Sequence, residues 1–441
     1  MRMSFSILYP LSLFLLLAGM RVCRNDQDLN EAFSMAKSEA KNFFSDDRLL
    51  IEKYIDNPHH IEFQVLCCRD PAATGEPKPE DFQVVVFPER ECSIQRRNQK
   101  VLEEAPSVLL NNETRMKMVE QVKKLCQTVG YESAGTIEFL VEHPKNPNDP
   151  QNFYFLEMNT RLQVEHPVSE SICGVDLVKG MLWIGAGWGL PEEFKTDQPM
   201  LPYKGHAIEA RIYAEDPLRG YLPSTGALRP YVEPPRQNVG MSDFDTGYTR
   251  MDSGVAAGHV VSPFYDPMLS KTIHYAPDRK QAIEGLAVAL DQYVIEGVQH
   301  NARLCNAVLR HPEFIAGNTP TSFLETHFPD GFKGVQLTKE QEEELAVSVA
   351  MIEKHKRPES ARETVVVQLG GLFGKAFEVT LGTDTAEVRF LTKNAEEESN
   401  GELRRIALDA VTEDGSTVEY KPREYVARVS LDGASRFIQV R

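Results

Sequence analysis

The sequence has little positive charge relative to its negative charge, and this imbalance limits the partners it can bind. It carries 48 lysines and arginines against 65 aspartates and glutamates, a formal net charge of -17 over 441 residues. Nucleic-acid binding relies on clustered lysine and arginine, so the balance argues against a nucleic-acid partner. A nucleotide enzyme can still be acidic overall, because only its cleft must be positive.

Cysteine is also scarce, and its pattern argues against a disulfide framework. The chain has 7 cysteines with no C-x-x-C spacing. Cys67 and Cys68 are adjacent in the sequence, so a bond between them would not constrain the fold. An odd number of scattered cysteines predicts free thiols in a reducing compartment.

One apolar run conflicts with that compartment. Residues 4–20 are rich in leucine and follow a single arginine. Taken alone, such a segment is typical of a signal-peptide core or a short anchor, although it is marginal for spanning a bilayer. It also lacks a clear cleavage site. A secreted or anchored protein therefore stays open as a weaker alternative.

The rest of the chain mixes helical and strand patterns, without an internal repeat. At 41% hydrophobic residues it can bury two or three cores. Apolar spacing predicts helices over 25–44, 112–126, 278–293 and 339–356, and a half-buried strand over 61–65. Asp26 or Asp28 can cap the first helix. Residues 198–202 read as a linker, and short alternating strands over 365–369, 376–381 and 387–391 predict a small antiparallel β unit.

The most informative stretch is 155–167, where a strand pattern runs into a dense row of polar side chains. Phe153 and Phe155 are followed on the same parity by Glu157, Asn159, Arg161, Gln163 and Glu165. If the strand persists, alternation places this row on one face. Such a row is costly to bury unless it binds something charged. The alternative is an exposed edge strand with a solvated face.

A second strand pattern upstream favours a bound cation. Residues 135–141 read as a strand, and the Pro- and Asn-rich segment 143–152 reads as a loop. In a hairpin centred on that loop, Glu138 falls opposite Glu157, and two facing carboxylates repel unless a cation lies between them. Magnesium prefers such oxygen ligands, so Glu138, Glu157 and Asn159 are candidate metal ligands. A surface hairpin with two solvated acids is the alternative.

These residues carry a resemblance to a known family. The run 157–167 resembles the ATP-grasp signature of biotin carboxylase, the ATP-dependent half of biotin-dependent carboxylases. The resemblance extends from about Met20 to Phe332, and its other motifs lie at 52–58, 91–100, 205–217, 265–268 and 329–334. With the β-rich tail after them, these motifs are most similar to propionyl-CoA carboxylase alpha subunits.

The resemblance implies an α+β fold with three parts after a leader. The leader is the hydrophobic segment at 1–20, for which a gene-model error is one explanation. The three parts after it are a partial ATP-grasp domain at 21–198, a biotin carboxylase C-terminal domain at 203–334, and a truncated antiparallel β-rich linker and docking (BT-like) domain at 338–441.

The implied reaction is carboxylation of biotin by bicarbonate, driven by ATP with Mg²⁺ or Mn²⁺. The roles that the family assigns fall on the following residues: catalytic Glu165, Arg211, Arg161 and Lys100; a bicarbonate cradle of Arg161, Gln163, Lys100 and the Val164 backbone; nucleotide contacts Glu52, Lys53, Ile55, His60, Gln95 and Asn98; and metal ligands Glu138, Glu157 and Asn159. Asn98 stands where many homologues carry histidine.

Three departures from the family pattern bear on activity. No nucleotide-fold domain precedes Met20, the glycine-rich phosphate loop is reduced to Gly19-Met20, and the upstream phosphate-binding lysines have no counterpart. At the other end no biotin carrier follows, and Lys117 in Met116-Lys117-Met118 is not expected to be biotinylated because it lies in a helical pattern. We therefore expect an incomplete copy with little or no turnover. A non-catalytic assembly or binding module of the carboxylase complex is the alternative.

The resemblance also implies partners and a location. The expected partners are a biotin carrier domain, a carboxyltransferase beta subunit and further copies of the chain. The expected location is the mitochondrial matrix, unless residues 4–20 are a true signal segment.

Overall fold

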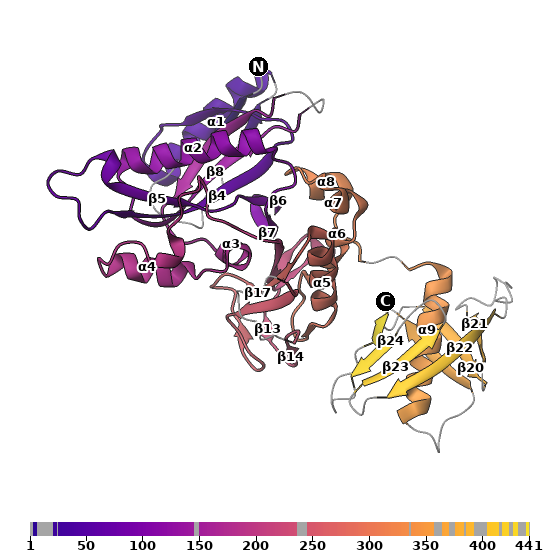
Figure 1. Cartoon of the computed structure of the whole chain (residues 1–441). Coiled ribbons are helices and arrows are strands. Elements are labelled where there is room, and N and C mark those ends of the chain that lie inside the picture. Colours follow the sequence, from indigo (N-terminus) through magenta and orange to yellow (C-terminus); the bar gives the residue numbers. More distant parts are fainter. Residues whose placement is uncertain are drawn as a thin grey trace. The chain divides into compact units, whose positions relative to one another are not determined.

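The computed structural model describes residues 3–6, 21–23, 25–144, 150–235, 245–334, 337–356, 364–369, 375–382, 385–391, 404–413, 417–422, 427–430 and 438–440. The chain divides into two compact units, which we describe separately (Figure 1). Unit 1 comprises residues 1–204 and 317–326, and unit 2 comprises residues 205–316 and 327–441.

Unit 1 begins with a short antiparallel sheet and a long helix. The elements are β1 (Met3–Ser6), β2 (Arg21–Cys23), α1 (Asp26–Phe44) and β3 (Leu50–Lys53). The cap of α1 differs from the prediction: Asn25 precedes the helix in an extended conformation, and its side chain accepts a hydrogen bond from the Asp28 backbone. Asp26 and Asp28 instead occupy the first turn, where their charge is favourable to the helix dipole.

The main sheet of unit 1 is antiparallel, in the order β7-β6-β4-β8-β9, with β5 also paired to β4. Its strands are β4 (His59–Arg69), β5 (Phe82–Val86), β6 (Arg90–Arg96), β7 (Gln99–Ala105), β8 (Ser133–Val141) and β9 (Phe153–Asn159). The helices of this unit after α1 are α2 (Asn112–Val129), α3 (His166–Cys173) and α4 (Leu177–Gly185), with short 3₁₀ turns η1 (Pro79–Asp81) and η2 (Glu192–Phe194).

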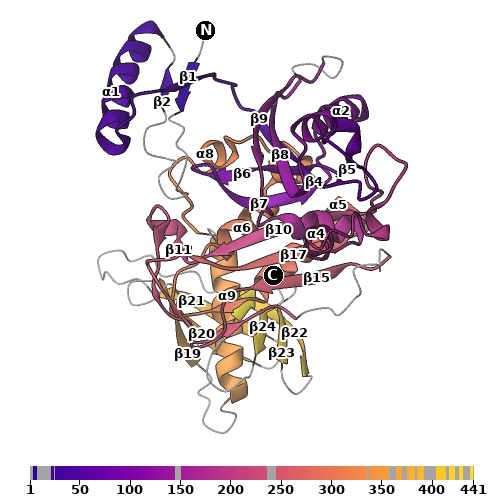
Figure 2. The same ribbon diagram turned by 90° about the vertical axis from the view of Figure 1, so that its left-hand side faces the viewer.

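The two faces of this sheet are covered by different helices. On one face, α2 contributes Val119 and Val122 to a core with Phe63 and Phe139. On the other, Leu177 of α4 packs in a second core with Leu66, Phe87 and Phe194. Figures 1 and 2 show α2 and α4 apart from one another, with β4 and β8 between them.

Strand β4 is more deeply buried than its alternating pattern suggests. The prediction of a half-buried strand is wrong, because every residue from His59 to Cys68 is buried. Glu62 and Gln64, on the polar parity, are both 0% exposed and take part in a buried polar network. The polar face of β4 therefore lines the site described below instead of facing solvent.

The predicted hairpin of β8 and β9 is confirmed, with Glu138 directly opposite Glu157 and Thr136 opposite Asn159. The predicted continuation of the strand to Glu165 is wrong. Strand β9 ends at Asn159, and Glu165 is the N-cap residue of α3. Pro167 in the first turn of α3 explains the change, since its fixed φ suits a helix start and it cannot donate to a strand ladder.

Unit 2 contains an antiparallel set of strands flanked by helices. Its larger elements are β10 (His206–Tyr213), β15 (Tyr248–Ser253), β17 (Met268–Ala276), α5 (Arg279–Asp291), α6 (Ala302–Leu309) and α7 (Pro312–Ala316). Strand β17 pairs with both β10 and β15, and α5 packs on β17 and β10. Asp278 caps α5 through the Gln281 backbone, which confirms the predicted helix start.

The shorter elements are β11 (Glu215–Asp216), η3 (Pro217–Arg219), β12 (Leu222–Pro223), β13 (Gly226–Ala227), β14 (Tyr231–Val232), β16 (Val260–Val261), β18 (Val294–Ile295) and, at the boundary of the two units, α8 (Phe323–His327).

The C-terminal part folds a helix onto an antiparallel sheet, as the sequence predicts. The elements are α9 (Lys339–Lys356), β19 (Thr364–Leu369), β20 (Lys375–Leu381), β21 (Thr385–Leu391), β22 (Arg404–Glu413), β23 (Thr417–Pro422), β24 (Ala427–Ser430) and β25 (Ile438–Val440). The strands follow one another in chain order across the sheet. Val347 and Ala350 of α9 pack with Phe377, Val379 and Val388 in one core.

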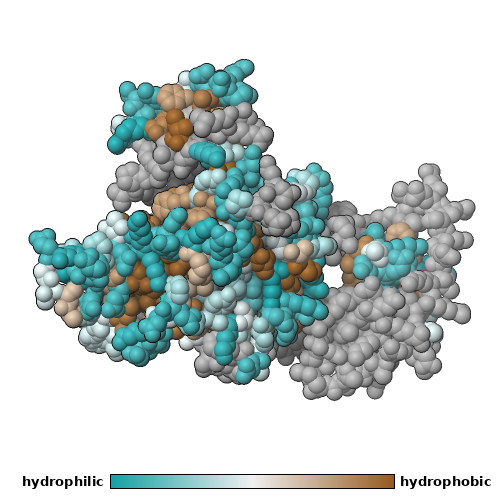
Figure 3. Space-filling view, turned by 45° about the horizontal axis from the view of Figure 1, so that its top comes forward, coloured by the Kyte–Doolittle hydropathy of each residue, from teal (hydrophilic) through white to brown (hydrophobic). Residues whose placement is uncertain are grey.

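The described surface matches the polar composition of the chain. On the face shown in Figure 3, hydrophilic side chains cover most of the described area, and hydrophobic side chains form separate areas between them. Within the described ranges, no helix has both the length and the apolar character needed to cross a membrane. Most of the leucine-rich leader, residues 7–20, lies outside those ranges.

Candidate functional site

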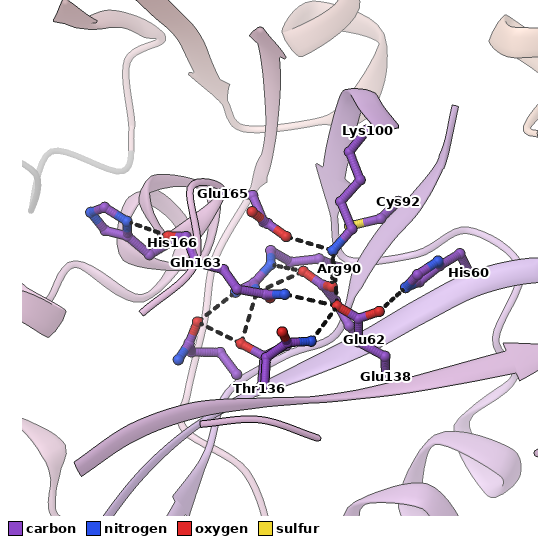
Figure 4. A network of polar contacts seen from close by, with 12 residues as sticks. His60, Glu62, Arg90, Cys92, Lys100, Thr136, Glu138, Gln163, Glu165 and His166 are labelled. Atoms are coloured by element: carbon purple, nitrogen blue, oxygen red, sulfur yellow. Dashed lines mark hydrogen bonds and ion pairs between the residues drawn. The ribbon is translucent and has the colours of Figure 1, made fainter. Parts of the chain in front are cut away.

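A lysine surrounded by three carboxylates lies at the centre of the candidate site (Figure 4). The Nζ atom of Lys100, on β7, is 2.5 Å from Oε2 of Glu62, 2.6 Å from Oε1 of Glu165 and 3.2 Å from Oε1 of Glu138. The carboxylates come from β4, from the N-cap of α3 and from β8. All three are buried, so this lysine neutralises charges that would otherwise be very costly.

The surroundings fix the charges of these groups. Burial alone would lower the pKa of Lys100, but the carboxylates of Glu165 and Glu62 raise it well above the usual lysine value. Burial alone would raise the pKa of Glu138, but a hydrogen bond from His60 and the charge of Lys100 hold it well below its usual range. At neutral pH the site therefore contains a protonated lysine and an ionised Glu138.

Glu138 connects most of the predicted site residues of unit 1. Its Oε1 accepts hydrogen bonds from Gln163 Nε2 at 2.7 Å and from Asn159 Nδ2 at 3.0 Å, and its Oε2 is 2.8 Å from His60 Nε2. Asn159 Nδ2 also donates to Glu157 Oε1 at 3.0 Å. The three predicted metal ligands thus lie together, with an amide N–H group between two carboxylates.

These residues fit a hard divalent cation. Glu138 is buried and Glu157 is exposed, so their carboxylate pair offers oxygen ligands with one side open to water and phosphate oxygens. The Asn159 N–H group now bridges the pair, and rotation of the amide would present its oxygen instead. His60, Glu62 and Glu138 also have ligand atoms within 4.8 Å of one another, but Lys100 already binds two of them.

The predicted bicarbonate groups lie on the segment between β9 and α3 and on β7. Gln163 is buried beside Glu138, and Glu165 is buried beside Lys100. Arg161 is exposed, and its guanidinium donates to the Leu162 carbonyl at 3.4 Å. The structure therefore brings Lys100, Gln163 and Glu165 into one network, with Arg161 at the exposed end of the same segment.

The predicted nucleotide residues divide into two groups. Gln95 Nε2 is 2.9 Å from His60 Nδ1, which links this pair to Glu138 through the other ring nitrogen of His60. Glu52 and Lys53 lie on β3, and Ile55 is buried just after it. Lys53 Nζ lies 5.0 Å from the ring centre of Tyr154, and nothing is described of the Glu52 side chain.

Asn98, the last predicted nucleotide contact, is exposed in the tight turn between β6 and β7, where it and Arg97 have positive φ angles of 65° and 49°. Asparagine tolerates this left-handed conformation better than most residues, so turn geometry accounts for it.

Arg211, the predicted stabiliser of negative charge, lies on β10 of unit 2. It is 8% exposed, and its Nη1 is 3.5 Å from the hydroxyl of Tyr213. Asn301 Nδ2 donates to the Arg211 carbonyl at 2.9 Å, and Asn301 Oδ1 accepts from the Tyr213 backbone at 2.8 Å. These bonds hold the backbone from the Arg211 carbonyl to the Tyr213 N–H in place.

The sequence reasoning missed two charged members of the network, Glu62 and Arg90. Glu62 binds Lys100, and Arg90 binds Glu62 with both Nε and Nη2 at 2.7 Å from the same carboxylate oxygen. Glu62 lies on the polar side of the alternation over residues 60–64, and this pattern could have indicated its role. A charged residue on a buried face of a strand needs a buried partner. No such pattern marks Arg90, because its neighbours in the sequence are charged residues of the kind that usually lie at the surface.

Comparison with known proteins shows which proteins this chain is similar to. Residues 17–193 match the carbamoyl-phosphate synthase L chain ATP-binding domain, and residues 209–326 match the biotin carboxylase C-terminal domain. The propionyl-CoA carboxylase alpha chain of Ruegeria pomeroyi is 41% identical over 96% of this chain and 60% of the relative. The human mitochondrial propionyl-CoA carboxylase alpha chain is 47% identical over 74% of this chain and 41% of the relative. The chain thus spans at most 60% of the length of these two relatives.

Solved structures support the same family. Biotin carboxylase from Campylobacter jejuni superposes with a TM-score of 0.62 at 37% identity, over 74% of this chain and 65% of that one. The biotin carboxylase domain of 2-oxoglutarate carboxylase from Hydrogenobacter thermophilus, solved with MgADP and bicarbonate, gives a TM-score of 0.63 at 36% identity, over 74% and 64% of the two chains. The predicted ATP-grasp, α+β architecture is confirmed by these matches. The chain belongs to the biotin carboxylase family of ligases and is homologous to propionyl-CoA carboxylase alpha chains.

Proposed function

We propose that this chain carries out the ATP- and Mg²⁺-dependent carboxylation of biotin by bicarbonate, as an alpha-type subunit of a propionyl-CoA-like carboxylase. One observation carries the proposal: Lys100 is held against Glu165 at 2.6 Å and beside Gln163 and Glu138 in a single buried network. This network combines cationic, amide and carboxylate groups, which is the set that binding and deprotonating a small oxyanion requires.

In the proposed mechanism, the network binds bicarbonate and removes its proton. Lys100 and Gln163 offer N–H donors, and the planar guanidinium of Arg161 can pair with two oxygens of the anion. Glu165 accepts the proton, because the charge of Lys100 beside it favours an ionised carboxylate ready to act as a base. In the overall reaction an oxygen of bicarbonate takes the terminal phosphoryl group of ATP and leaves as phosphate, with ADP as the other product. The carbon of bicarbonate bonds to a ureido nitrogen of biotin in place of the proton on that nitrogen, which is released.

The nucleotide and its metal have a proposed place next to this base. Glu138, Glu157 and Asn159 would hold Mg²⁺, which when bound neutralises phosphate charge during ATP cleavage. His60 and Gln95 would contact the nucleotide, together with Glu52, Lys53, Ile55 and Asn98. His60 bonds Glu138 directly, so the proposed nucleotide and metal sites are connected.

Arg211 and the partners complete the proposal. Arg211 would stabilise negative charge on the ureido oxygen of biotin during carboxyl transfer. The biotin would arrive on a carrier domain, a carboxyltransferase beta subunit would use the carboxylated product, and several copies of the chain would assemble. The relatives named mitochondrial support the mitochondrial matrix as the location.

The test is ATP cleavage by the purified chain with free biotin, in the presence and absence of bicarbonate. We expect release of phosphate that requires bicarbonate and stops when Mg²⁺ is chelated. Radiolabelled ATP makes the assay sensitive to slow cleavage. Tight MgATP binding without bicarbonate-dependent cleavage would contradict the enzyme proposal and support the non-catalytic module.

A further inference from the structure

Arg90, at the start of β6, is a fully buried arginine that no proposed step uses. Its side chain is 0% exposed, yet it lies within a polar network and not among apolar residues. Besides Glu62, its guanidinium contacts three elements and the segment before α3: Gln64 Oε1 at 3.0 Å, Ser169 Oγ at 2.9 Å, Thr136 Oγ1 at 3.5 Å and Gln163 Oε1 at 3.4 Å.

A purely structural role explains this arrangement poorly. Burying a guanidinium is expensive, and apolar residues of similar volume often stabilise a core at least as well. The carboxylate of Glu62 compensates the charge of Arg90, and together with Glu165 it keeps the arginine protonated despite burial. The remaining contacts add no charge compensation. They are made to neutral side chains, and one of these, Gln163, donates to Glu138, which contacts Lys100.

The first of these groups is the amide of Gln163. Its Oε1 faces Arg90 at 3.4 Å, and its Nε2 donates to Glu138 at 2.7 Å. Arginine has only N–H donors, so it can donate only to the oxygen side of the amide. Arg90 therefore favours the orientation in which the N–H side of Gln163 faces the proposed metal and anion site.

The second group is Lys100, which Arg90 reaches through Glu62. One oxygen of Glu62 accepts both Nε and Nη2 of Arg90, and the other accepts Lys100 Nζ at 2.5 Å. A third link leads to Ser169, which lies one turn along α3 from its N-cap residue Glu165. Arg90 thus contacts one group of the proposed bicarbonate site, Gln163, and supports a second, Lys100, through Glu62.

We propose that Arg90 is a positioning residue for bicarbonate: it sets the Gln163 amide directly and Lys100 through Glu62. The role assigned to the anion rests on the proposed function, whereas the positioning of the two side chains does not. The planar fork is essential to the role, because Arg90 reaches Glu62, Ser169 and Gln163 with three different nitrogens, Nε, Nη1 and Nη2. Lysine keeps the charge but places all its N–H donors on one nitrogen, so it does not reproduce these separate positions.

The main variant is Arg90→Lys. We expect the bicarbonate concentration for half-maximal ATP cleavage to rise roughly 10- to 100-fold, as for displaced groups around a reacting anion. The ATP concentration for half-maximal rate should change less than about threefold, because Arg90 contacts neither His60 nor Gln95. A general loss of folding would lower the maximal rate but would not change the bicarbonate requirement more than the ATP requirement.

Arg115→Lys is the matched control. Arg115 also pairs with a buried glutamate, Glu89, through two guanidinium nitrogens, with Nε and Nη2 at 2.9 and 2.7 Å from Oε1. It touches none of the site residues, so its loss should affect thermal unfolding but not the bicarbonate dependence. If Arg90→Lys does not fold, Ser169→Ala removes only one of the contacts of Arg90 and should raise the bicarbonate requirement in the same direction by roughly threefold.

A crystal structure of Arg90→Lys separates the positioning claim from the proposed function. We expect the Gln163 amide and Lys100 Nζ to leave their wild-type positions while β4 and β8 stay in place. If the wild-type chain shows no bicarbonate-dependent cleavage, the proposed function fails and this structural readout still decides the positioning claim. Unmoved Gln163 and Lys100 side chains, or an unchanged bicarbonate requirement in an active variant, would overturn the inference.

Discussion

Glu165→Gln should reduce bicarbonate-dependent ATP cleavage at least about 100-fold, while nucleotide binding changes less than about threefold. The amide keeps the size and hydrogen-bonding capacity of the carboxylate, but it cannot take up the proton of bicarbonate. Glu165 caps α3 without a side-chain hydrogen bond to the helix backbone, so the helix start should survive the change. The measurement is phosphate release against bicarbonate concentration, with MgADP binding by calorimetry.

The matched control for this variant is Glu170→Gln on the same helix. Glu170 is also buried, and its Oε1 accepts a hydrogen bond from the Leu177 backbone at 2.7 Å, which a glutamine oxygen can replace. We expect wild-type bicarbonate dependence. A Glu165→Gln protein that retains more than about a tenth of the wild-type rate would show that another group acts as the base.

Lys100→Met should both abolish bicarbonate-dependent cleavage and lower the free energy of unfolding by about 3–5 kcal/mol. The substitution leaves Glu62, Glu138 and Glu165 buried around an apolar side chain, without the cation that now contacts all three. Urea unfolding at several pH values measures the loss. Lys117→Met is the control, since Lys117 forms an exposed pair with Glu113 on α2 and its loss should leave stability almost unchanged.

The pH dependence of that loss has a definite sign. The pKa of Lys100 is raised in the fold, so its stabilising effect is complete below the unfolded lysine pKa and is lost only as the pH rises through the higher folded value. The pKa of Glu138 is lowered, so its contribution is present above the unfolded carboxylate pKa and is lost as the pH falls. The stability gap between wild type and Lys100→Met should therefore be widest near neutral pH and narrow below about pH 4.5. A gap independent of pH would contradict the ion cluster.

The sequence predicted the hairpin well because two independent patterns agreed there. Strand alternation over 135–141 and 153–159, with a Pro- and Asn-rich loop between them, allowed the register that pairs Glu138 with Glu157. The extension to Glu165 failed because parity cannot show where a strand ends. Pro167 could have indicated the start of a helix, because proline is favoured in the first helical turn. This indication is stronger than the polar alternation that continues to Glu165.

The supporting network could not be predicted from local pattern. Arg90 and Glu62 come from neighbouring strands, but the links to Ser169 and Gln163 span 79 and 73 residues of sequence. Strand periodicity gives the face on which a side chain lies, not which distant groups share that face. The depth of β4 was missed for the same reason, since its polar side chains are buried by partners from β6, β7 and β8.

The most direct test is a crystal structure of the wild-type chain grown with MgADP and bicarbonate. We expect an anion within hydrogen-bond distance of Lys100 Nζ, the Gln163 amide and the Arg161 guanidinium, with a carboxylate oxygen of Glu165 beside it and the cation between Glu138 and Glu157. A structure in which saturating bicarbonate leaves Lys100 bound only to its three carboxylates, with the anion elsewhere or absent, would contradict the assignment of this network as a bicarbonate site.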